Sequence, residues 1–211
     1  IRARNREQQL ALELLLDDEI QLVTMSGKAG TGKTLLAIAA GLSKVVDEQA
    51  YSKLLVARPI QPMGKKMGFL PGDVEEKMGP WMQPIFDNLD FIVHRNKDAR
   101  FAYQKLLDKD LIQVEPLTYI RGRSVPNQFV IIDEAQNLSL HEVKTIVTRA
   151  GEGSKFVFTG DPFQIDNPYL NFHKNGLNYL AHKFHDQKIA GHVMLKEGER
   201  SELAEIASDL L

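Results

Sequence analysis

The sequence predicts an α/β fold, in which a mainly parallel sheet is covered by helices on both faces. The main observation is that short apolar runs alternate with helical segments along the 211 residues, as they do when helices connect parallel strands. Hydrophobic residues make up 43% and charged residues 26%, which is ordinary for a globular protein and excludes disorder of the whole chain. The length suits one domain, so residues 1–211 are predicted to form a single domain.

The expected strands are short apolar runs. Examples are IQLVTM, which begins at Ile20, and FVIID, which ends at Asp133. Apolar runs of roughly four to eight residues are typical of strands that are buried in a sheet. The six expected strands are 20–25, 53–57, 111–115, 129–133, 155–159 and 191–195.

The expected helices are identified by their apolar periodicity and by the residues that begin and end helices. The run at 34–46 is apolar almost all round, which suits a helix packed against a sheet. Ser139 and Glu142 have the spacing of a capping box, so a helix should begin there and end at Gly151. Residues 203–210 repeat apolar side chains at the helix period. The remaining expected helices are 4–16, 101–109 and one that carries His182 and His185.

Residues 59–84 break this alternation. The segment PIQPMGKKMGFLPGDVEEKMGPWMQP contains five of the nine prolines, four of the six methionines and the only tryptophan. Because proline and glycine interrupt regular structure, the segment is predicted to be irregular. Its methionine and tryptophan content favours packing, including packing onto a partner.

Charge and cysteine content exclude several function classes. The 26 basic and 28 acidic residues give a net charge of −2, which argues against indiscriminate DNA binding but leaves a local basic groove open. Cysteine is absent, so disulfides, thiolate catalysis and cysteine zinc sites are excluded, and a reducing cytoplasm is the expected location. No apolar run approaches the ~20 residues needed to span a bilayer, so no membrane partner is expected. The chain begins at Ile1 rather than Met, which is compatible with a fragment of a longer protein.

The strongest motif is GKAGTGKT, Gly27 to Thr34, which matches G-x-x-x-x-G-K-[ST] in full. The two glycines allow a tight loop after a strand, and the loop's N–H groups then point at phosphate oxygens. The following helix adds the positive end of its dipole. In such a loop Lys33 reaches the β- and γ-phosphates and the Thr34 hydroxyl binds Mg²⁺. The expected strand before the loop and helix after it agree with this interpretation.

Two further strand ends carry polar residues that suit the same chemistry. FVIIDEAQN places Asp133 and Glu134 at the end of an apolar strand, where Asp133 can hold Mg²⁺ through its water shell and Glu134 can accept a proton from an attacking water. TGDPFQID places Asp161 and Gln164 at another strand end. A glutamine near the γ-phosphate can sense it or orient water, although Asp-Pro is also ordinary turn chemistry.

Together these elements resemble the first motor domain of superfamily 1 helicases, and more closely the PhoH family of ATPases, over nearly the whole chain. The resemblance implies a RecA-like P-loop NTPase fold and rests on seven stretches. These are NREQ at 5–8, GKAGTGKT, ARPIQPMGKKMGFLPGD at 57–73, YIRGRS at 119–124, VIIDEAQN, TGDPFQID and GERSELAEIA at 198–207.

The resemblance also implies individual roles. Gln8 would recognise the edge of adenine, with which a glutamine amide can form two hydrogen bonds. Gln164 would couple the state of the γ-phosphate to the side of the domain that binds nucleic acid. Arg200 would act as an arginine finger. The candidates for catalysis are Lys33, Asp133, Glu134, Gln164 and Arg200, and those for metal binding are Thr34 and Asp133. The candidates for nucleotide binding are Gln8, Gly27, Lys28, Ala29, Gly30, Thr31, Gly32, Lys33, Thr34 and Leu35.

Such helicases bind ATP between two motor domains, whereas this chain has length for one. A neighbouring subunit could supply the missing wall, which predicts a homo-oligomer such as a hexameric ring. Arg121 and Arg123 are then alternative fingers that act in trans. The resemblance to the PhoH family implies single-stranded RNA as the nucleic acid and a PIN-type nuclease domain as a neighbour in a longer chain. Its path could be lined by Lys65, Lys66, Arg58, Arg121, Arg123 and Trp81, because phosphates need cations and bases stack on aromatic rings.

Two other function classes remain open at the level of sequence. A P-loop kinase would transfer the γ-phosphate to a small molecule and could use RGRS as a lid, although Asp133 and Glu134 suit water activation better. A GTP-switched binding module would need N-K-x-D, and the nearest match, NKDA at Asn96, has its Asp one position early. His182 and His185 are three residues apart but have no obvious third ligand, so the six histidines are interpreted as surface or packing residues.

Overall fold

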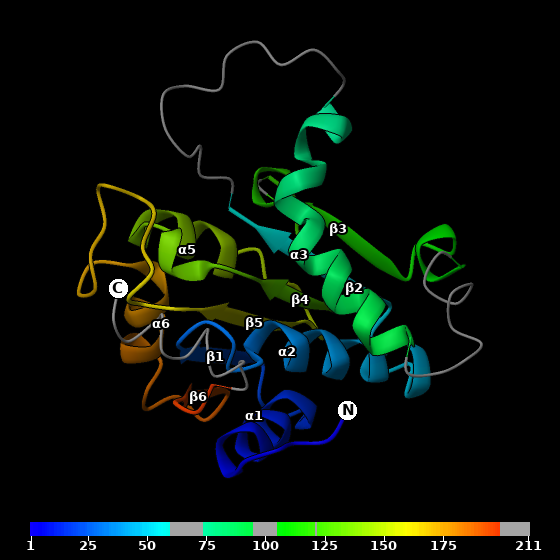
Figure 1. Ribbon diagram of the computed structural model, residues 1–211, viewed down its shortest axis with the longest axis horizontal. Helices are drawn as coiled ribbons and strands as arrows, with labels where there is room; N and C mark the ends of the chain where they lie inside the picture. The colour runs from blue at the N-terminus through cyan, green and yellow to red at the C-terminus, as the bar shows by residue number, and fades with distance from the viewer. Residues whose placement is uncertain (60–73, 95–104, 121, 199–211) are drawn as a thin grey trace.

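The protein, as a computed structural model, contains a sheet of six parallel strands in the order β3-β2-β4-β5-β1-β6 (Figure 1). The structure describes residues 1–59, 74–94, 105–120 and 122–198, with the side chains of 74–80 and 94 left out. The strands are β1 (Leu22–Gly27), β2 (Lys53–Arg58), β3 (Ile112–Pro116), β4 (Gln128–Ile132), β5 (Lys155–Gly160) and β6 (Ala190–Leu195). The predicted fold class, a mainly parallel sheet, is therefore confirmed.

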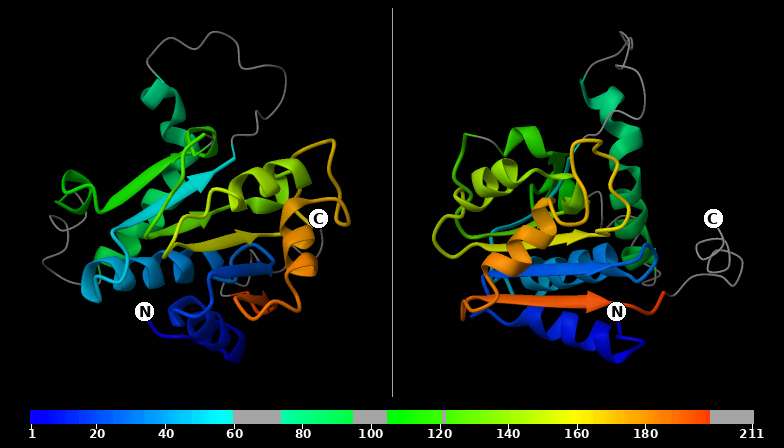
Figure 2. Two further views of the ribbon diagram at one scale, coloured as in Figure 1. Left: turned by 180° about the vertical axis from the view of Figure 1, so that it is seen from behind. Right: turned by 90° about the vertical axis from the view of Figure 1, so that its left-hand side faces the viewer.

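Helices cover both faces of this sheet, also as predicted (Figures 1 and 2). On one face lie α1 (Arg6–Leu16), α2 (Lys33–Leu42), which continues as the π-helical turn η1 (Ser43–Asp47), and α3 (Val74–His94). On the other face lie α5 (Leu140–Val147) and α6 (Gly176–Lys183). Two short 3-10 turns, η2 (Leu117–Tyr119) and η3 (Ala135–Asn137), follow β3 and β4.

Alternation along the strands divides the core into two layers. In β4, Phe129 and Ile131 belong to the cluster beneath α1, α2 and α3, whereas Val130 and Ile132 belong to the cluster beneath α5 and α6. All four side chains are fully buried. Successive strand residues point to opposite faces, so a strand covered on both sides must be apolar on both, as this one is from Phe129 to Ile132.

The prediction that 59–84 is irregular is wrong for residues 74–84, where the backbone belongs to α3. Pro80 and Pro84 each remove a backbone donor, which costs about 3 kcal/mol in a helix interior. Met82, Ile85 and Leu89 lie at i, i+3 and i+7 and are almost completely buried in the cluster beneath α2. Their tertiary packing offsets the local cost of the prolines. Residues 60–73 lie outside the described part.

The helix that begins after Ser139 ends at Val147 and not at Gly151. Its start is as predicted, because the Ser139 and Glu142 side chains form both hydrogen bonds of the capping box. Its end comes earlier because the chain beyond it pairs with another segment: the Arg149 carbonyl accepts the Val125 N–H, and Val125 and Ala150 form an isolated bridge. The expected helix at 203–210 and residues 101–104 of the one at 101–109 lie outside the described residues, and 105–108 are helical.

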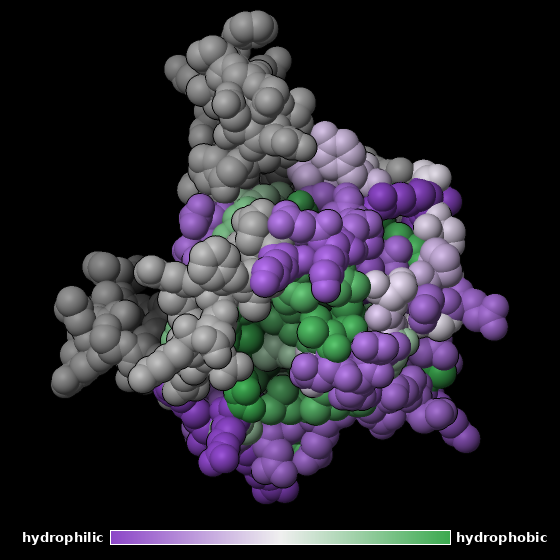
Figure 3. All heavy atoms as spheres, turned by 90° about the vertical axis from the view of Figure 1, so that its right-hand side faces the viewer, coloured by the Kyte–Doolittle hydropathy of each residue, from purple (hydrophilic) through white to green (hydrophobic). Residues whose placement is uncertain are grey.

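The two ends of the sheet differ in character. The strands are parallel, so all their carboxyl ends share one edge, where the polar side chains of the predicted site follow β1, β4 and β5. The view onto the side of the amino ends shows an apolar area framed by polar residues (Figure 3). Since ligands of open α/β sheets bind outside the carboxyl ends of the strands, the functional site is expected at the carboxyl edge.

Lys155 at the start of β5 is fully buried and ties the sheet to α1. Its ammonium donates to the carbonyl oxygens of Leu14 at 2.9 Å and Asp17 at 2.6 Å, at the carboxyl end of that helix. Replacing Lys155 by Met should lower the free energy of unfolding by about 2 kcal/mol at neutral pH, because buried carbonyls lose their donor. The check is urea denaturation of both proteins.

The same lysine gives a pH dependence. Burial lowers the pKa of Lys155 to about 8, from an ordinary 10.5. Between these values the unfolded chain binds more protons than the folded chain, so the free energy of unfolding rises with pH across this window. Lys155→Met should lack that rise, so the gap between the two proteins should widen above about pH 8. An equal gap on both sides of that pH would contradict the prediction.

Candidate active site

The loop between β1 and α2 has the backbone shape that its glycines predict. Gly32 has a φ of +88° and precedes the first residue of α2 without a side-chain cap, so the first N–H groups of α2 are left to face an anion. A Cβ on Gly27 would lie 2.2 Å from the carbonyl oxygen of Leu195. The first glycine is therefore required by close packing against β6, and the second by its left-handed backbone.

The Lys33 ammonium lies inside this loop. Its Nζ donates to the carbonyl oxygens of Gly27 and Lys28, both at 2.7 Å. The side chain is buried, with 8% of the residue exposed. Lys33 thus supports the loop from within, and its charge lies where the loop would surround phosphate oxygens.

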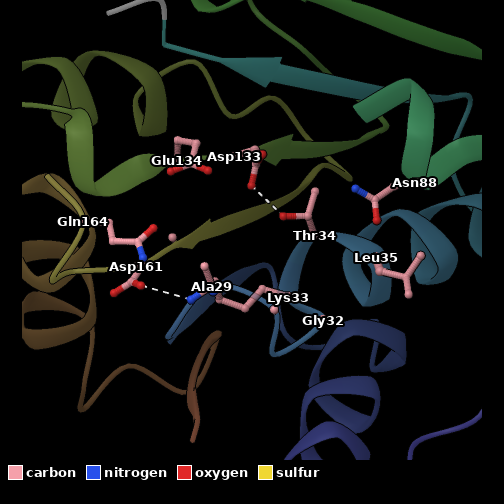
Figure 4. Close-up of a pocket in the computed structure, with 12 residues that line it drawn as sticks. Ala29, Gly32, Lys33, Thr34, Leu35, Asn88, Asp133, Glu134, Asp161 and Gln164 are labelled. Carbon is pink, nitrogen blue, oxygen red and sulfur yellow. Dashed lines mark hydrogen bonds between the residues drawn. The ribbon is translucent and has the colours of Figure 1, made fainter. Parts of the chain in front are cut away.

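Asp133 connects the loop to the centre of the sheet. Its Oδ1 accepts hydrogen bonds from the Thr34 hydroxyl at 2.8 Å and the Thr159 hydroxyl at 2.7 Å. The ends of β4 and β5 and the start of α2 therefore meet at one carboxylate, which is 4% exposed. The structure brings the two candidate metal ligands, Thr34 and Asp133, into direct contact (Figure 4). A hydroxyl and a carboxylate are hard oxygen donors of the kind that Mg²⁺ prefers, so the residues present fit that ion.

Glu134 lies beside Asp133 with its backbone in the left-handed region, at a φ of +56°. Its Oε1 accepts from the Arg58 guanidinium at 3.2 Å, and its Oε2 accepts from the Gln136 amide. Partial burial raises the pKa of Glu134, and the charge of Asp133 raises it further; the Gln136 hydrogen bond and the cations Arg58 and Lys33 oppose the rise. The carboxylate is thus held from two sides at the edge of the cavity.

Asp161 fixes the phosphate loop from the other side. Its Oδ2 accepts from the Ala29 N–H at 3.1 Å, and its Oδ1 accepts from the Phe163 N–H at 3.0 Å. Gln164, three residues later, is exposed and lines the same cavity. The turn after β5, which the sequence alone could not distinguish from an ordinary Asp-Pro turn, therefore contacts the phosphate loop directly through Asp161.

These elements enclose a cavity of about 270 Å³ at the carboxyl edge of the sheet (Figure 4). It is lined by Ala29, Gly30, Gly32, Lys33, Thr34, Leu35, Asn88, Asp133, Glu134, Gly160, Asp161 and Gln164. Most of the predicted site residues line this cavity, because their motifs follow strands that end at the same edge. Sequence reasoning missed Asn88, which α3 brings to the cavity and for which no motif exists.

A second cavity of about 310 Å³ shares Gly30, Gly32 and Leu35 with the first. Its other walls include Gln8, Leu36 and Phe91. The Gln8 amide accepts from the Arg4 N–H at 2.9 Å and donates to the Thr31 carbonyl at 3.2 Å. Gln8 is therefore attached to the phosphate loop, as its candidate role requires, and faces a partly apolar space next to it.

Other candidates are engaged elsewhere or lie outside the described residues. Arg123 donates to Glu115 at 2.6 Å beside β3, on the far edge of the sheet from β1, so the structure does not bring it to the cavity. Arg58 contacts Glu134 and the Trp81 carbonyl, the latter at 3.4 Å. The candidates outside the described part are Lys65, Lys66, Arg121 and Arg200.

The five histidines whose side chains the structure describes agree with their interpretation as surface or packing residues. His141, His173, His182, His185 and His192 are all exposed. Across the described ranges, no group of three or more His, Asp or Glu side chains could hold a metal ion by itself. Within the same ranges, no helix is both long enough and apolar enough to cross a lipid bilayer.

Comparison with known proteins gives a family match over almost the whole chain. The PhoH family model, described as PhoH-like protein, matches residues 1–210. The chain is 60% identical over 211 residues to Protein PhoH2 of Bacillus subtilis (strain 168), covering all of this chain and 48% of that protein. It is 39% identical to Protein PhoH2 of Mycolicibacterium smegmatis, covering all of this chain and 47% of the other. The chain thus spans about half the length of these curated relatives.

Solved structures resemble the chain in fold. The large terminase of a thermophilic bacteriophage matches with a TM-score of 0.53 and 12% identity, over 92% of this chain and 46% of that one. The SWI2/SNF2 ATPase core of Sulfolobus solfataricus in complex with dsDNA matches with a TM-score of 0.51 and 14% identity, over 96% and 46% of the two chains. Both likenesses agree with a RecA-like P-loop core.

Proposed function

Because the chain belongs to the PhoH family and has a P-loop NTPase core, we propose that it is a Mg²⁺-dependent ATPase that binds ATP across the phosphate loop and hydrolyses its γ-phosphate. The observation that carries the proposal is the contact between Thr34 and Asp133 at 2.8 Å, with Glu134 beside it at the same cavity. Thr34 and Asp133 would hold the metal, and Glu134 would activate water. Thr34 lies 99 positions before Asp133 in the sequence, so the fold brings them together.

Each residue has a chemical task in this reaction. The loop N–H groups and the Lys33 ammonium bind and orient the phosphates, and Thr34 and Asp133 would hold Mg²⁺. The ion, when bound, neutralises charge that develops on the phosphate oxygens. Glu134 accepts a proton from the attacking water at its carboxylate, which Arg58 and Gln136 hold at the cavity. Gln164 orients the water or senses the γ-phosphate.

The second cavity supports a choice of adenine as the base. Leu35, Leu36 and Phe91 give it apolar walls, which suit the faces of a purine. Although the Gln8 amide already makes two hydrogen bonds, a glutamine amide has a further donor hydrogen and a further lone pair. These can pair with N6 and N7 of adenine, while guanine offers two acceptors at the same edge.

We further propose that the ATPase works as a homo-oligomer on single-stranded RNA in the cytoplasm, as a motor or a switch. Exposed aromatic side chains in the segment after β5 support a subunit contact: Phe163 is 72% exposed and Tyr169 is 91% exposed. The ring centroids of Phe163 and Phe172 lie 5.0 Å apart. Large apolar side chains exposed together commonly mark an interface. Arg200 of one subunit would then reach the site of the next, and the longer relatives leave room for a PIN-type domain.

The test measures inorganic phosphate release from ATP and from GTP, with and without single-stranded RNA, together with the mass of the protein in solution. We expect Mg²⁺-dependent release from ATP in preference to GTP, stimulation by RNA and a mass of several subunits. Transfer of the γ-phosphate to an added small-molecule acceptor, with no inorganic phosphate released, would favour a kinase and contradict the proposal. Stimulation by single-stranded DNA to the same extent would remove the RNA preference.

A further inference from the structure

Gln136 is a fully buried polar side chain between the strand ends that carry the proposed site. It belongs to η3, the turn directly after Glu134. The chemistry proposed above gives it no task. A buried amide is costly unless its hydrogen bonds are made, so its partners indicate what it does.

The Gln136 amide contacts both stretches that would face the γ-phosphate in the proposed reaction. Its Nε2 donates to the Glu134 carboxylate and to the Gln164 carbonyl, the latter at 3.0 Å, and its Oε1 accepts from the Asp161 N–H at 3.2 Å. Both amide hydrogens are therefore used, and the amide cannot turn over without placing donors against donors. This fixes the amide in one orientation, and with it Oε2 of Glu134.

The contacts continue to the phosphate loop. Asp161, whose N–H Gln136 accepts, itself accepts the Ala29 N–H at 3.1 Å. A continuous set of hydrogen bonds therefore runs from the proposed base, through Gln136 and Asp161, to the phosphate-binding backbone. Gly160 allows this arrangement, because a Cβ there would lie 2.2 Å from the Gln136 Oε1.

We propose that Gln136 is a positioning residue that holds the Glu134 carboxylate in line for water activation and joins it to the 161–164 loop beside the phosphates. The proposal rests on the proposed function, since it assigns Gln136 a part in the same reaction. Arg58 holds the other oxygen of Glu134, so the carboxylate needs both contacts to keep one orientation. Misplacing a catalytic group by about 1 Å can slow a reaction about 100-fold.

The test compares Gln136→Met, which keeps the side-chain length and removes all three hydrogen bonds, with the wild type in the intact protein. We expect kcat to fall about 10- to 100-fold, while the Kd for ADP changes less than about threefold. The matched control is Asn137→Ala. Asn137 is also buried and its side chain accepts from the N–H groups of Asp166 and Asn167, so it supports the same loop at its other end. A loss of kcat in this control as large as in Gln136→Met would overturn the proposal, because loop support alone would explain both.

A double-mutant cycle separates positioning from general loosening. If Gln136 acts through the Glu134 carboxylate, Gln136→Met should cause no further loss of single-turnover rate in a Glu134→Gln background. The same fold-loss in both backgrounds, or an unchanged kcat in Gln136→Met alone, would overturn the role. An unchanged rate in Glu134→Gln alone would instead remove the base itself, and with it the proposed function, while Gln136 is intact.

If Gln136→Met does not fold, the same measurements can be made on Gly160→Ala. The added methyl group would displace the Gln136 amide without deleting it, and the backbone at Gly160 is not among the positive-φ residues. We expect the same fall in kcat in the wild-type background and none in Glu134→Gln. Wild-type kcat in Gly160→Ala would contradict the proposal.

Discussion

Glu134→Gln is expected to bind ATP as tightly as the wild type and to hydrolyse it about 100- to 10,000-fold more slowly, which is the range for the loss of a general base. The amide has the shape of the carboxylate but cannot accept a proton from water at neutral pH. Arg58 and Gln136 donate to different oxygens of Glu134, so the glutamine oxygen can still accept from one of them. The measurements are calorimetric Mg-ATP binding and single-turnover phosphate release.

The variant has a structural cost that must be separated from its chemical effect. A glutamine at 134 presents one oxygen and one NH₂ group where Arg58 and Gln136 both donate, so one contact becomes donor against donor. Thermal unfolding of the variant measures this cost. Glu152→Gln is the matched control, since it removes one negative charge at an exposed turn before β5 and should leave turnover unchanged. Wild-type turnover in Glu134→Gln would exclude Glu134 as the base.

The parts of the site that could be predicted are those set by local sequence. The loop between Gly27 and Thr34 takes its shape from its own glycines and from the strand and helix on either side. Asp133 and Asp161 are recognisable because each follows an apolar run. Parallel strands bring their carboxyl ends to one edge, so the sequence is enough to place these carboxylates beside the loop once the strands are assigned correctly.

The parts that could not be predicted depend on contacts between distant residues. Arg58 meets Glu134 across 76 positions of sequence, and only the neighbouring places of β2 and β4 in the sheet bring them together. Asn88 reaches the cavity because α3 crosses above α2, and α3 itself was not predicted. Its prolines argue for a break, whereas the burial of Ile85 and Leu89 is tertiary and leaves only a helix-period pattern that the prolines obscure.

For α6 a helix was expected around His182, but its beginning at Gly176 could not be predicted, for a different reason. Only eight residues long, it follows a stretch rich in asparagine and contains just two fully apolar anchors, Leu177 and Leu180. Its start is set by Asn175, whose side chain accepts the Asn178 N–H, and asparagine is equally common in turns and at helix starts. The pattern is therefore too short to fix where the helix begins.

Lys33→Ala is expected to abolish measurable hydrolysis, with a loss of about 1000-fold or more, and to weaken ATP binding as well. Two effects add. The ammonium that would stabilise charge on the β- and γ-phosphates is removed, and so are its hydrogen bonds to the carbonyls of Gly27 and Lys28, each at 2.7 Å. Those carbonyls lie in the phosphate loop, so the loop itself should loosen too.

Lys33→Met distinguishes the two effects, because it keeps the buried stem of the side chain and removes only the charge and its hydrogen bonds. If phosphate binding is the main role, both variants should lose hydrolysis and affinity equally, while Lys33→Met should unfold at a higher temperature than Lys33→Ala. Lys188→Ala is the control for losing one positive charge. Lys188 is exposed in the turn before β6, at the amino ends of the strands and away from the site. ATP hydrolysis at the wild-type rate in Lys33→Met would mean that the phosphates bind somewhere other than this loop.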